Sequence, residues 1–218
     1  MNRTSIIEQF HEHEELAEKF YALDVKIMKV LDVSSFCREL PLHVAELFDV
    51  PHAWLSIIED SKAARFVRGK GETVLVARDV FSQLLPNSNH PLVLNDELNA
   101  YFRLLPPSRR DHFKSLAMVP IHLDGELVGS LNQADPDPRR FNPHYNTTHL
   151  ERLAVKLSLG LSNVIAHEQV QHLAYHDHLT SLPNRRAMER LLVAELARAE
   201  RYGCELTVAF IDLDHFKG

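Results

Sequence analysis

This 218-residue chain is short of several features that would place it in a specialised class of protein. It has only two cysteines, Cys37 and Cys204, which give no disulfide framework and suit a reducing compartment. It has no excess of basic residues, since its formal net charge is −6, and this argues against general nucleic-acid binding. It also lacks a run of about 18 apolar residues and the apolar core of a signal peptide. We therefore expect a cytoplasmic protein that neither spans a membrane nor binds nucleic acid.

Apolar residues make up 45% of the chain, which is enough for a core, and their spacing predicts a mixture of helices and short strands. Steps of three and four residues predict helices over residues 6–31, 34–48, 95–105 and 147–175. Runs of β-branched and aromatic residues predict strands at His52–Ile58, Ala64–Val67 and Thr73–Ala77. This order of elements indicates an α+β module.

The clearest local signal is a hairpin formed by Ser115–Leu123 and Glu126–Leu131. The Asp124-Gly125 pair between them supplies the positive φ angles that a two-residue type I′ turn requires. Pro120 lies inside the first arm and cannot donate a backbone hydrogen bond, so it indicates either an edge strand or a bulge.

The hairpin and the segment after it resemble the closing half of a GAF domain. The residues that carry the resemblance are Ser115-Leu-Ala-Met-Val-Pro-Ile, Gly125-Glu-Leu-Val-Gly129-Ser-Leu and Asp135-Pro-Asp-Pro-Arg-Arg-Phe141. The resemblance is to a bacterial GAF-like type without a defined ligand, and it covers roughly residues 20–168. It implies an antiparallel sheet flanked by helices. We assign residues 1–168 to this sensor domain, including its N-terminal helix.

Domains of this kind resemble small-molecule sensors with a pocket between the sheet and the helices. The resemblance therefore implies a sensor ligand, whose identity the sequence leaves unknown. The candidate wall residues are Trp54, Phe66, Phe102, Phe113 and Met118. The alternative is that these five side chains only fill the hydrophobic core.

Residues 147–175 read as one connecting helix that overlaps the end of the sensor. Its first apolar stripe follows a spacing close to a heptad seam and consists of Leu150, Leu153, Leu157, Leu161 and Val164. We expect this stripe to form a homodimer contact, while Val155, Leu159 and Ile165 cover the sensor sheet. The alternative is a helix buried only against its own domain. His172 and His176 are four residues apart, a spacing that is compatible with zinc but weak evidence without a third ligand.

The ten residues Asp177–Arg186 predict a corner between two helices. Pro183 disfavours α geometry in the residue before it, and Asn184 can cap the helix that follows. Together with residues 174–176, this stretch resembles the entrance of a GGDEF domain, the diguanylate cyclase family. The matching residues, for which the resemblance implies structural roles, are Asp177, Leu179, Thr180, Asn184, Arg185 and Arg186.

A strand expected at Glu205–Ile211 leads into Asp212-Leu-Asp-His-Phe-Lys217, which resembles the first active-site motif of that family. A carboxylate at the carboxyl end of a buried strand is a common place for metal-dependent nucleotide chemistry. The resemblance implies that Asp212 and the backbone carbonyl of Leu213 bind Mg²⁺. It also implies that the backbone amides of His215 and Phe216 meet the GTP phosphates. We assign residues 176–218 to a truncated α/β GGDEF domain.

In that family, two GGDEF domains each hold one GTP, and a dimer condenses the two molecules into cyclic di-GMP. The resemblance thus implies that this chain is the sensory region of a diguanylate cyclase. The seven glycines include no adjacent pair, so the sequence lacks the family's Gly-Gly-(Asp/Glu)-Glu-Phe motif, and we expect the chain alone to be inactive. The alternative is a degenerate GGDEF protein that binds a nucleotide or mediates dimerisation in signalling.

Overall fold

The structure is a computed structural model that describes residues 3–67, 73–87, 89–105, 113–177 and 179–212, with side chains from residue 14 onward. The chain divides into two compact units, Met1–Glu168 and Gln169–Gly218, and each is described by itself. No described helix combines the length and the apolar character that crossing a lipid bilayer requires.

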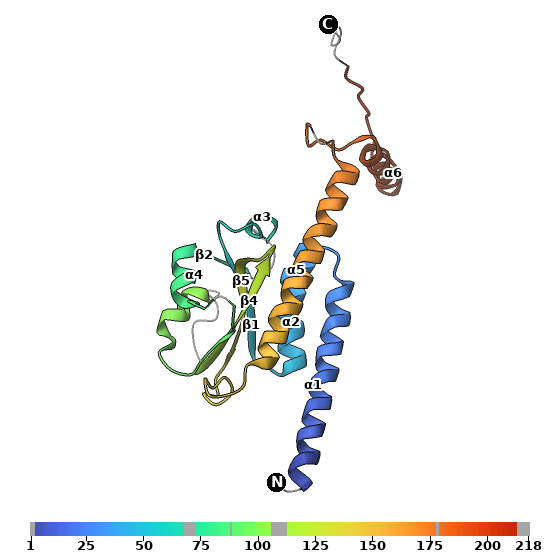
Figure 1. The fold of residues 1–218 in the computed structure, drawn as a ribbon. Coiled ribbons are helices and arrows are strands. Elements are labelled where there is room, and N and C mark those ends of the chain that lie inside the picture. Colours follow the sequence, from blue (N-terminus) through green and yellow to red (C-terminus); the bar gives the residue numbers. More distant parts are fainter. Residues whose placement is uncertain (1–2, 68–72, 88, 106–112, 178, 213–218) are drawn as a thin grey trace. The chain divides into compact units, whose positions relative to one another are not determined.

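The first unit is built on a five-stranded sheet with the strand order β2-β1-β5-β4-β3 (Figure 1). The strands are β1 (His52–Ile58), β2 (Thr73–Val76), β3 (Leu92–Leu94), β4 (Ser115–Leu123) and β5 (Glu126–Asp135). β1 and β2 pair in parallel, and the other neighbouring pairs are antiparallel. The α+β fold class expected from the sequence is confirmed.

β4 and β5 form the predicted hairpin. Asp124 and Gly125 have φ angles of 52° and 77°, as a type I′ turn requires. β4 lies between β5 and β3 in the sheet, but it pairs with β3 only over Leu116–Met118, so at Pro120 it has a neighbouring strand on the β5 side alone, as the edge-strand alternative expects. A register shift directly after Ile121 shows that β4 also has a bulge next to this position. The pairing of β4 with β3 ends at Met118, so Pro120 lies where no β3 partner needs its missing N–H.

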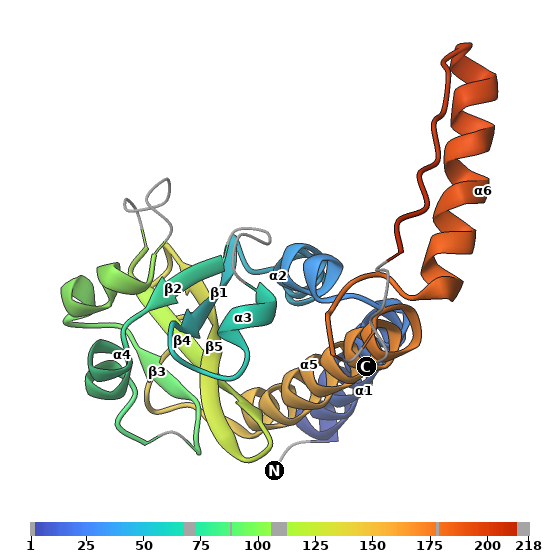
Figure 2. The same ribbon diagram turned by 90° about the horizontal axis from the view of Figure 1, so that it is seen from above.

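Three helices cover one face of the sheet: α1 (Arg3–Lys29), α2 (Val33–Phe48) and α5 (Thr148–Tyr175), of which residues up to Glu168 belong to this unit (Figures 1 and 2). The largest hydrophobic cluster lies between them and the sheet. Gly160 allows α5 to approach the other two helices, because a Cβ there would come within 2.7 Å of Ile27 Cγ2 and 3.0 Å of Phe36 Cε2.

The opposite face of the sheet is covered by α4 (Arg78–Leu84) and the 3₁₀ helix η1 (Leu98–Leu104), which enclose a second hydrophobic cluster. α4 is not predicted from the sequence, and η1 replaces the helix expected over residues 95–105. The strand predicted at residues 64–67 is wrong, because this segment is the short helix α3 (Ala64–Val67). The amides of Phe66 and Val67 both donate to the carbonyl of Ala63, which closes a helical turn.

The second unit contains the last turns of α5, the corner at residues 176–184 and α6 (Arg185–Tyr202). The strand predicted at Glu205–Ile211 is not formed, since residues 204–212 belong to no helix or strand. Phe210 and Ile211 are each 91% exposed. A strand is stabilised by a neighbouring strand, and the described part of this unit contains no strand that could pair with it.

Candidate functional site

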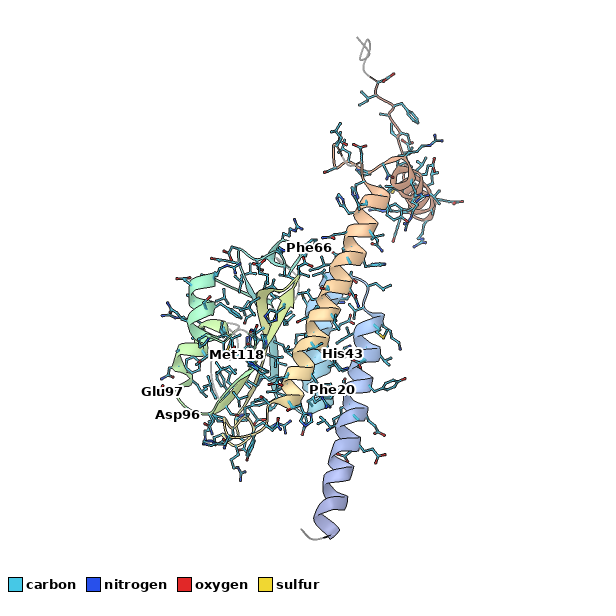
Figure 3. The ribbon with its side chains drawn as sticks, in the orientation of Figure 1. Phe20, His43, Phe66, Asp96, Glu97 and Met118 are labelled. Carbon is cyan, nitrogen blue, oxygen red and sulfur yellow. The ribbon has the colours of Figure 1, made fainter. Side chains whose placement is uncertain are left out.

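The five residues expected to line a sensor pocket do not lie together. Trp54 and Met118 are buried in the cluster beneath α4 and η1, where Phe102 and Phe113 pack partly buried. The rings of Phe102 and Phe113 meet edge to face, with centroids 5.5 Å apart. Phe66 lies apart from Met118 and packs against the helix-side cluster, so its assignment to the same wall is wrong (Figure 3).

A chain of buried polar groups runs beneath Trp54 and ties η1 to the sheet. The carbonyl of Leu104 accepts from Trp54 Nε1 at 2.6 Å and from Ser56 Oγ at 3.2 Å. Asn132 Nδ2 donates to Ser56 Oγ at 2.7 Å, and Ser130 Oγ donates to Asn132 Oδ1 at 2.8 Å. Buried polar groups that satisfy one another hold a core in one arrangement. On this face, the side chains of the predicted pocket therefore pack as core.

In α5 the structure buries the apolar stripe predicted to be the dimer seam and exposes two of the three residues predicted to cover the sheet. Leu153, Leu157, Leu161 and Val164, which were expected to form the dimer seam with Leu150, are at most 2% exposed and pack in their own domain. Assigning this stripe to a partner is wrong, because α1, α2 and the sheet already bury it. Val155 and Leu159, expected to cover the sheet, are 60% and 61% exposed, whereas Ile165 of the same stripe is buried.

Polar contacts fasten the carboxyl end of the sensor part of α5 to the link between α1 and α2. Glu168 Oε1 accepts from the backbone N–H of Val33 at 2.8 Å, and His167 Nδ1 lies 2.7 Å from the carbonyl oxygen of Leu31. Nearer the amino-terminal end of α5, Lys156 forms a salt bridge with Asp24 of α1. The sensor part of α5 is therefore held by polar contacts at its carboxyl end as well as by packing along its apolar side.

Asp177 organises the corner through its carboxylate and its backbone. Asp177 Oδ1 accepts from Thr180 Oγ1 at 2.8 Å and from the amides of Thr180 and Leu179 at 2.9 and 3.2 Å. The amide of Asp177 donates to the carbonyl of Leu182, and Ser181 N donates back to the Asp177 carbonyl. Ser181 has a φ of 57°, which the tight turn requires. These hydrogen bonds join the two ends of the loop to each other.

Asn184 joins the two helices that meet at this corner. Its Oδ1 accepts from the amide of Ala187 at 3.1 Å and so caps α6, while its Nδ2 donates to the carbonyl of Ala174 in α5 at 3.0 Å. Arg185 Nε donates to Glu189 Oε1 at 2.9 Å, one helical turn away. Asn184 therefore performs the capping that its position predicts, and it also ties α6 back to α5.

The described residues provide no metal centre. His172 and His176 stack with ring centroids 4.2 Å apart, and no group of three or more His, Cys, Asp or Glu side chains gathers within the described ranges. Asp212 is exposed and offers one hard oxygen ligand, while Leu213, His215 and Phe216 lie outside the described residues. One carboxylate by itself does not make a Mg²⁺ site.

Two family models match this chain: "GAF domain" over residues 32–161 and "Diguanylate cyclase, GGDEF domain" over residues 174–218. The first match covers more than half of the sequence, so the chain belongs to the GAF domain family. A GAF domain structure from Coxiella burnetii supports the fold, with a TM-score of 0.52 and 16% identity over 72% of this chain and 96% of that one. Both resemblances expected from the sequence are confirmed.

Among curated proteins, the chain is similar to the diguanylate cyclase DgcP of Escherichia coli, with 32% identity over 107 residues. That match covers 45% of this chain and 31% of the relative. The chain is also 42% identical over 52 residues to the cyclic di-GMP phosphodiesterase NbdA of Pseudomonas aeruginosa, covering 24% of this chain and 7% of NbdA. The chain thus spans less than a third of the length of either relative.

Proposed function

We propose that this chain is the sensory and connecting region of a diguanylate cyclase. The observation that carries the proposal is one continuous helix, α5, that begins in the GAF domain and ends at the GGDEF-like corner. In this proposal residues 1–168 sense, residues 147–175 connect, and residues 176–218 begin the catalytic domain. The reaction is the condensation of two GTP molecules into cyclic di-GMP.

The lengths of the matches to the two relatives favour synthesis of cyclic di-GMP over its breakdown. Both carry names that concern this nucleotide, but one is a cyclase and the other a phosphodiesterase. The match to the cyclase extends over 107 residues, about twice the 52 residues shared with the phosphodiesterase. The longer similarity covers 45% of this chain and supports the cyclase as the better guide.

In the complete enzyme, Asp212 and the backbone carbonyl of Leu213 would hold Mg²⁺, which supplies positive charge to a reacting phosphate when it is bound. The backbone amides of His215 and Phe216 would bind the GTP phosphates. Since the sequence has no adjacent glycines, it lacks the family's Gly-Gly-(Asp/Glu)-Glu-Phe motif, and we propose that these 218 residues alone do not make the product.

We further propose that the protein is a homodimer, because each of two GGDEF domains supplies one GTP. The predicted seam is buried, so the contact must use another face. Val155 and Leu159 of α5 are large, apolar and exposed, and they lie one helical turn apart. We propose that these two side chains contact the same residues of a second copy.

We infer that the protein works in the cytoplasm of a bacterium. Both relatives come from bacteria, and neither Cys37 nor Cys204 takes part in a disulfide, as a reducing compartment favours. Fractionation of the source cells with an antibody against residues 14–168 tests this inference. Recovery of the protein in the periplasm would contradict it.

The cyclase proposal is tested with a chain that continues through a complete GGDEF domain, incubated with GTP and Mg²⁺. We expect cyclic di-GMP and pyrophosphate, detected by liquid chromatography and mass spectrometry, and loss of both products in an Asp212→Asn variant. Binding of GTP without any product would instead support the degenerate alternative. No binding and no product would leave only dimerisation as the role of the output domain.

A further inference from the structure

A cavity of about 260 Å³ opens on the helix-covered face of the sheet, on the side away from Trp54 and Met118. Leu16 and Phe20 of α1 form part of its wall, and Leu150 and Leu153 of α5 form another part. Its remaining wall comes from β3, β5, the end of α2 and the segment before α5. Phe20 is labelled in Figure 3. Every lining residue belongs to the sensor unit and to the described part of the chain.

One buried side chain in this wall, Gln133, has an amide nitrogen that lacks a hydrogen-bond partner among the described residues. Gln133 of β5 is 3% exposed, and within the described residues its Nε2 has no hydrogen-bond partner. Its neighbours across the sheet, Ala53 on β1 and Ala117 on β4, are small and cannot reach it with a polar group. A buried amide donor without a partner is unfavourable, and a bound acceptor would satisfy it.

The charge around the cavity is suited to an acceptor oxygen. None of the described residues that line it is acidic, whereas Arg140 lies at its wall and donates to the backbone carbonyls of Phe48 and Asp49. The rest of the lining is mainly apolar and aromatic, including Phe141. A ligand that fits must therefore bury a hydrocarbon or aromatic body and present an oxygen lone pair to Gln133.

We propose that this cavity is a ligand site for a small, mostly apolar molecule with one accepting oxygen, either a ketone or a carboxylate, that accepts a hydrogen bond from Gln133 Nε2. The site lies on the opposite face from the pocket expected from the sequence. Because α1 and α5 both contribute walls, a bound ligand bears directly on the helix that leaves the sensor. The inference deepens the sensory part of the proposed function and rests on it for its biological role.

Binding is tested with the 218-residue chain labelled with ¹⁵N and with ¹³C in the leucine methyl groups, followed by NMR. Three probes are titrated: acetophenone, benzoate, and ethylbenzene, which replaces the ketone of acetophenone with a methylene group. We expect acetophenone to shift the Gln133 side-chain amide and the methyl signals of Leu150 and Leu153. We expect ethylbenzene to bind at least several-fold more weakly. Tighter binding of benzoate than of acetophenone would identify the carboxylate as the accepting group, and the reverse would identify the ketone.

Two variants separate the amide from the cavity. Gln133→Met removes the donor at nearly constant size, and we expect acetophenone and ethylbenzene then to bind equally. Gln83→Met removes an exposed amide of the same unit and should leave the wild-type preference unchanged. Leu150→Trp fills the cavity and should abolish binding of all three probes. If Gln133→Met does not fold, the shift of the wild-type Gln133 amide decides the question.

The proposal is overturned if no probe shifts the Gln133 amide, or if the wild-type chain binds ethylbenzene as tightly as it binds both acetophenone and benzoate. Neither result involves GTP. A cyclase that fails to make cyclic di-GMP would therefore leave the binding result standing, and failure of the ligand site would leave the cyclase proposal standing.

Discussion

The carboxylate of Glu168 lies at the amino-terminal end of α2, where its Oε1 accepts from the backbone amide of Val33 at 2.8 Å, across 135 residues of sequence. Amides at the start of a helix have no partner within the helix, and a negative charge there is favourable. Glu168 is the last residue of the sensor unit. The end of the sensor is therefore held by a side chain of the connecting helix itself.

Replacing Glu168 with alanine should lower the free energy of unfolding of the sensor by about 1–2 kcal/mol, because the Val33 amide loses a charged acceptor. Urea denaturation followed by circular dichroism measures the change. Glu59→Ala, at an exposed position, is the control and should change stability by less than about 0.5 kcal/mol. Equal effects of the two substitutions would show that the contact contributes nothing.

Gly160→Val should destabilise the sensor by about 1–3 kcal/mol, because added carbon atoms overlap Ile27 and Phe36 at the contact of α5 with α1 and α2. The neighbouring substitution Asn163→Ala, on the exposed side of α5, should be neutral or slightly stabilising, since alanine is the better helix former. Thermal unfolding of both variants decides the matter. A Gly160→Val protein as stable as wild type would mean that the helices can separate at no cost.

The double substitution Val155→Asp and Leu159→Asp should convert the proposed homodimer to a monomer without unfolding it. Both side chains are exposed, so two charges there disturb only a contact with another copy. Light scattering coupled to size exclusion measures the mass. Leu157→Asp is the contrasting variant, and it should unfold the domain because it buries a charge. A wild-type chain that is monomeric at high concentration would contradict the dimer proposal.

Substitutions of Asn184 should separate its two roles at the corner. Asn184→Ala removes the α6 cap and the bond to Ala174, and should destabilise α6 by about 1 kcal/mol. Asn184→Asp keeps a capping oxygen but loses the Nδ2 donor, so α6 should stay protected while the bond to α5 is lost. Hydrogen exchange of the α6 amides provides the measurement. Similar exchange in Asn184→Ala and wild type would argue against the cap.

Lowering the pH should destabilise the sensor partly through His122. Burial lowers the pKa of His122 below its ordinary value of 6.5, so the unfolded chain binds the proton more readily than the folded one. This contribution is absent well above pH 6.5 and grows as the pH falls through 6.5 toward the lower folded pKa. Urea unfolding of His122→Gln over the same range should show a weaker pH dependence than wild type. An identical slope would exclude His122 as a cause.

Local sequence patterns are enough to predict much of this fold. The α5 helix, the strand at residues 52–58 and the Asp124-Gly125 hairpin all follow from periodicity or from turn chemistry, which depend on neighbouring residues. The corner at Asp177–Asn184 is equally local, because its hydrogen bonds connect residues no more than ten positions apart. The family matches, over residues 32–161 and 174–218, include the strand, the hairpin and the corner.

Long-range packing determined the rest. Spacing shows that α5 has two apolar stripes, but it cannot say which one meets the domain, and the structure buries Leu157 and exposes Leu159. Residues 64–67 have the composition of a strand and form a helical turn, since they lie beside α2 instead of along a sheet. The segment at 205–211 has every local feature of a buried strand yet pairs with none, because a strand exists only with a partner. Gln133 gives no signal in the sequence at all. Its unmet hydrogen bond arises from the cavity that α1, α5 and the sheet enclose together.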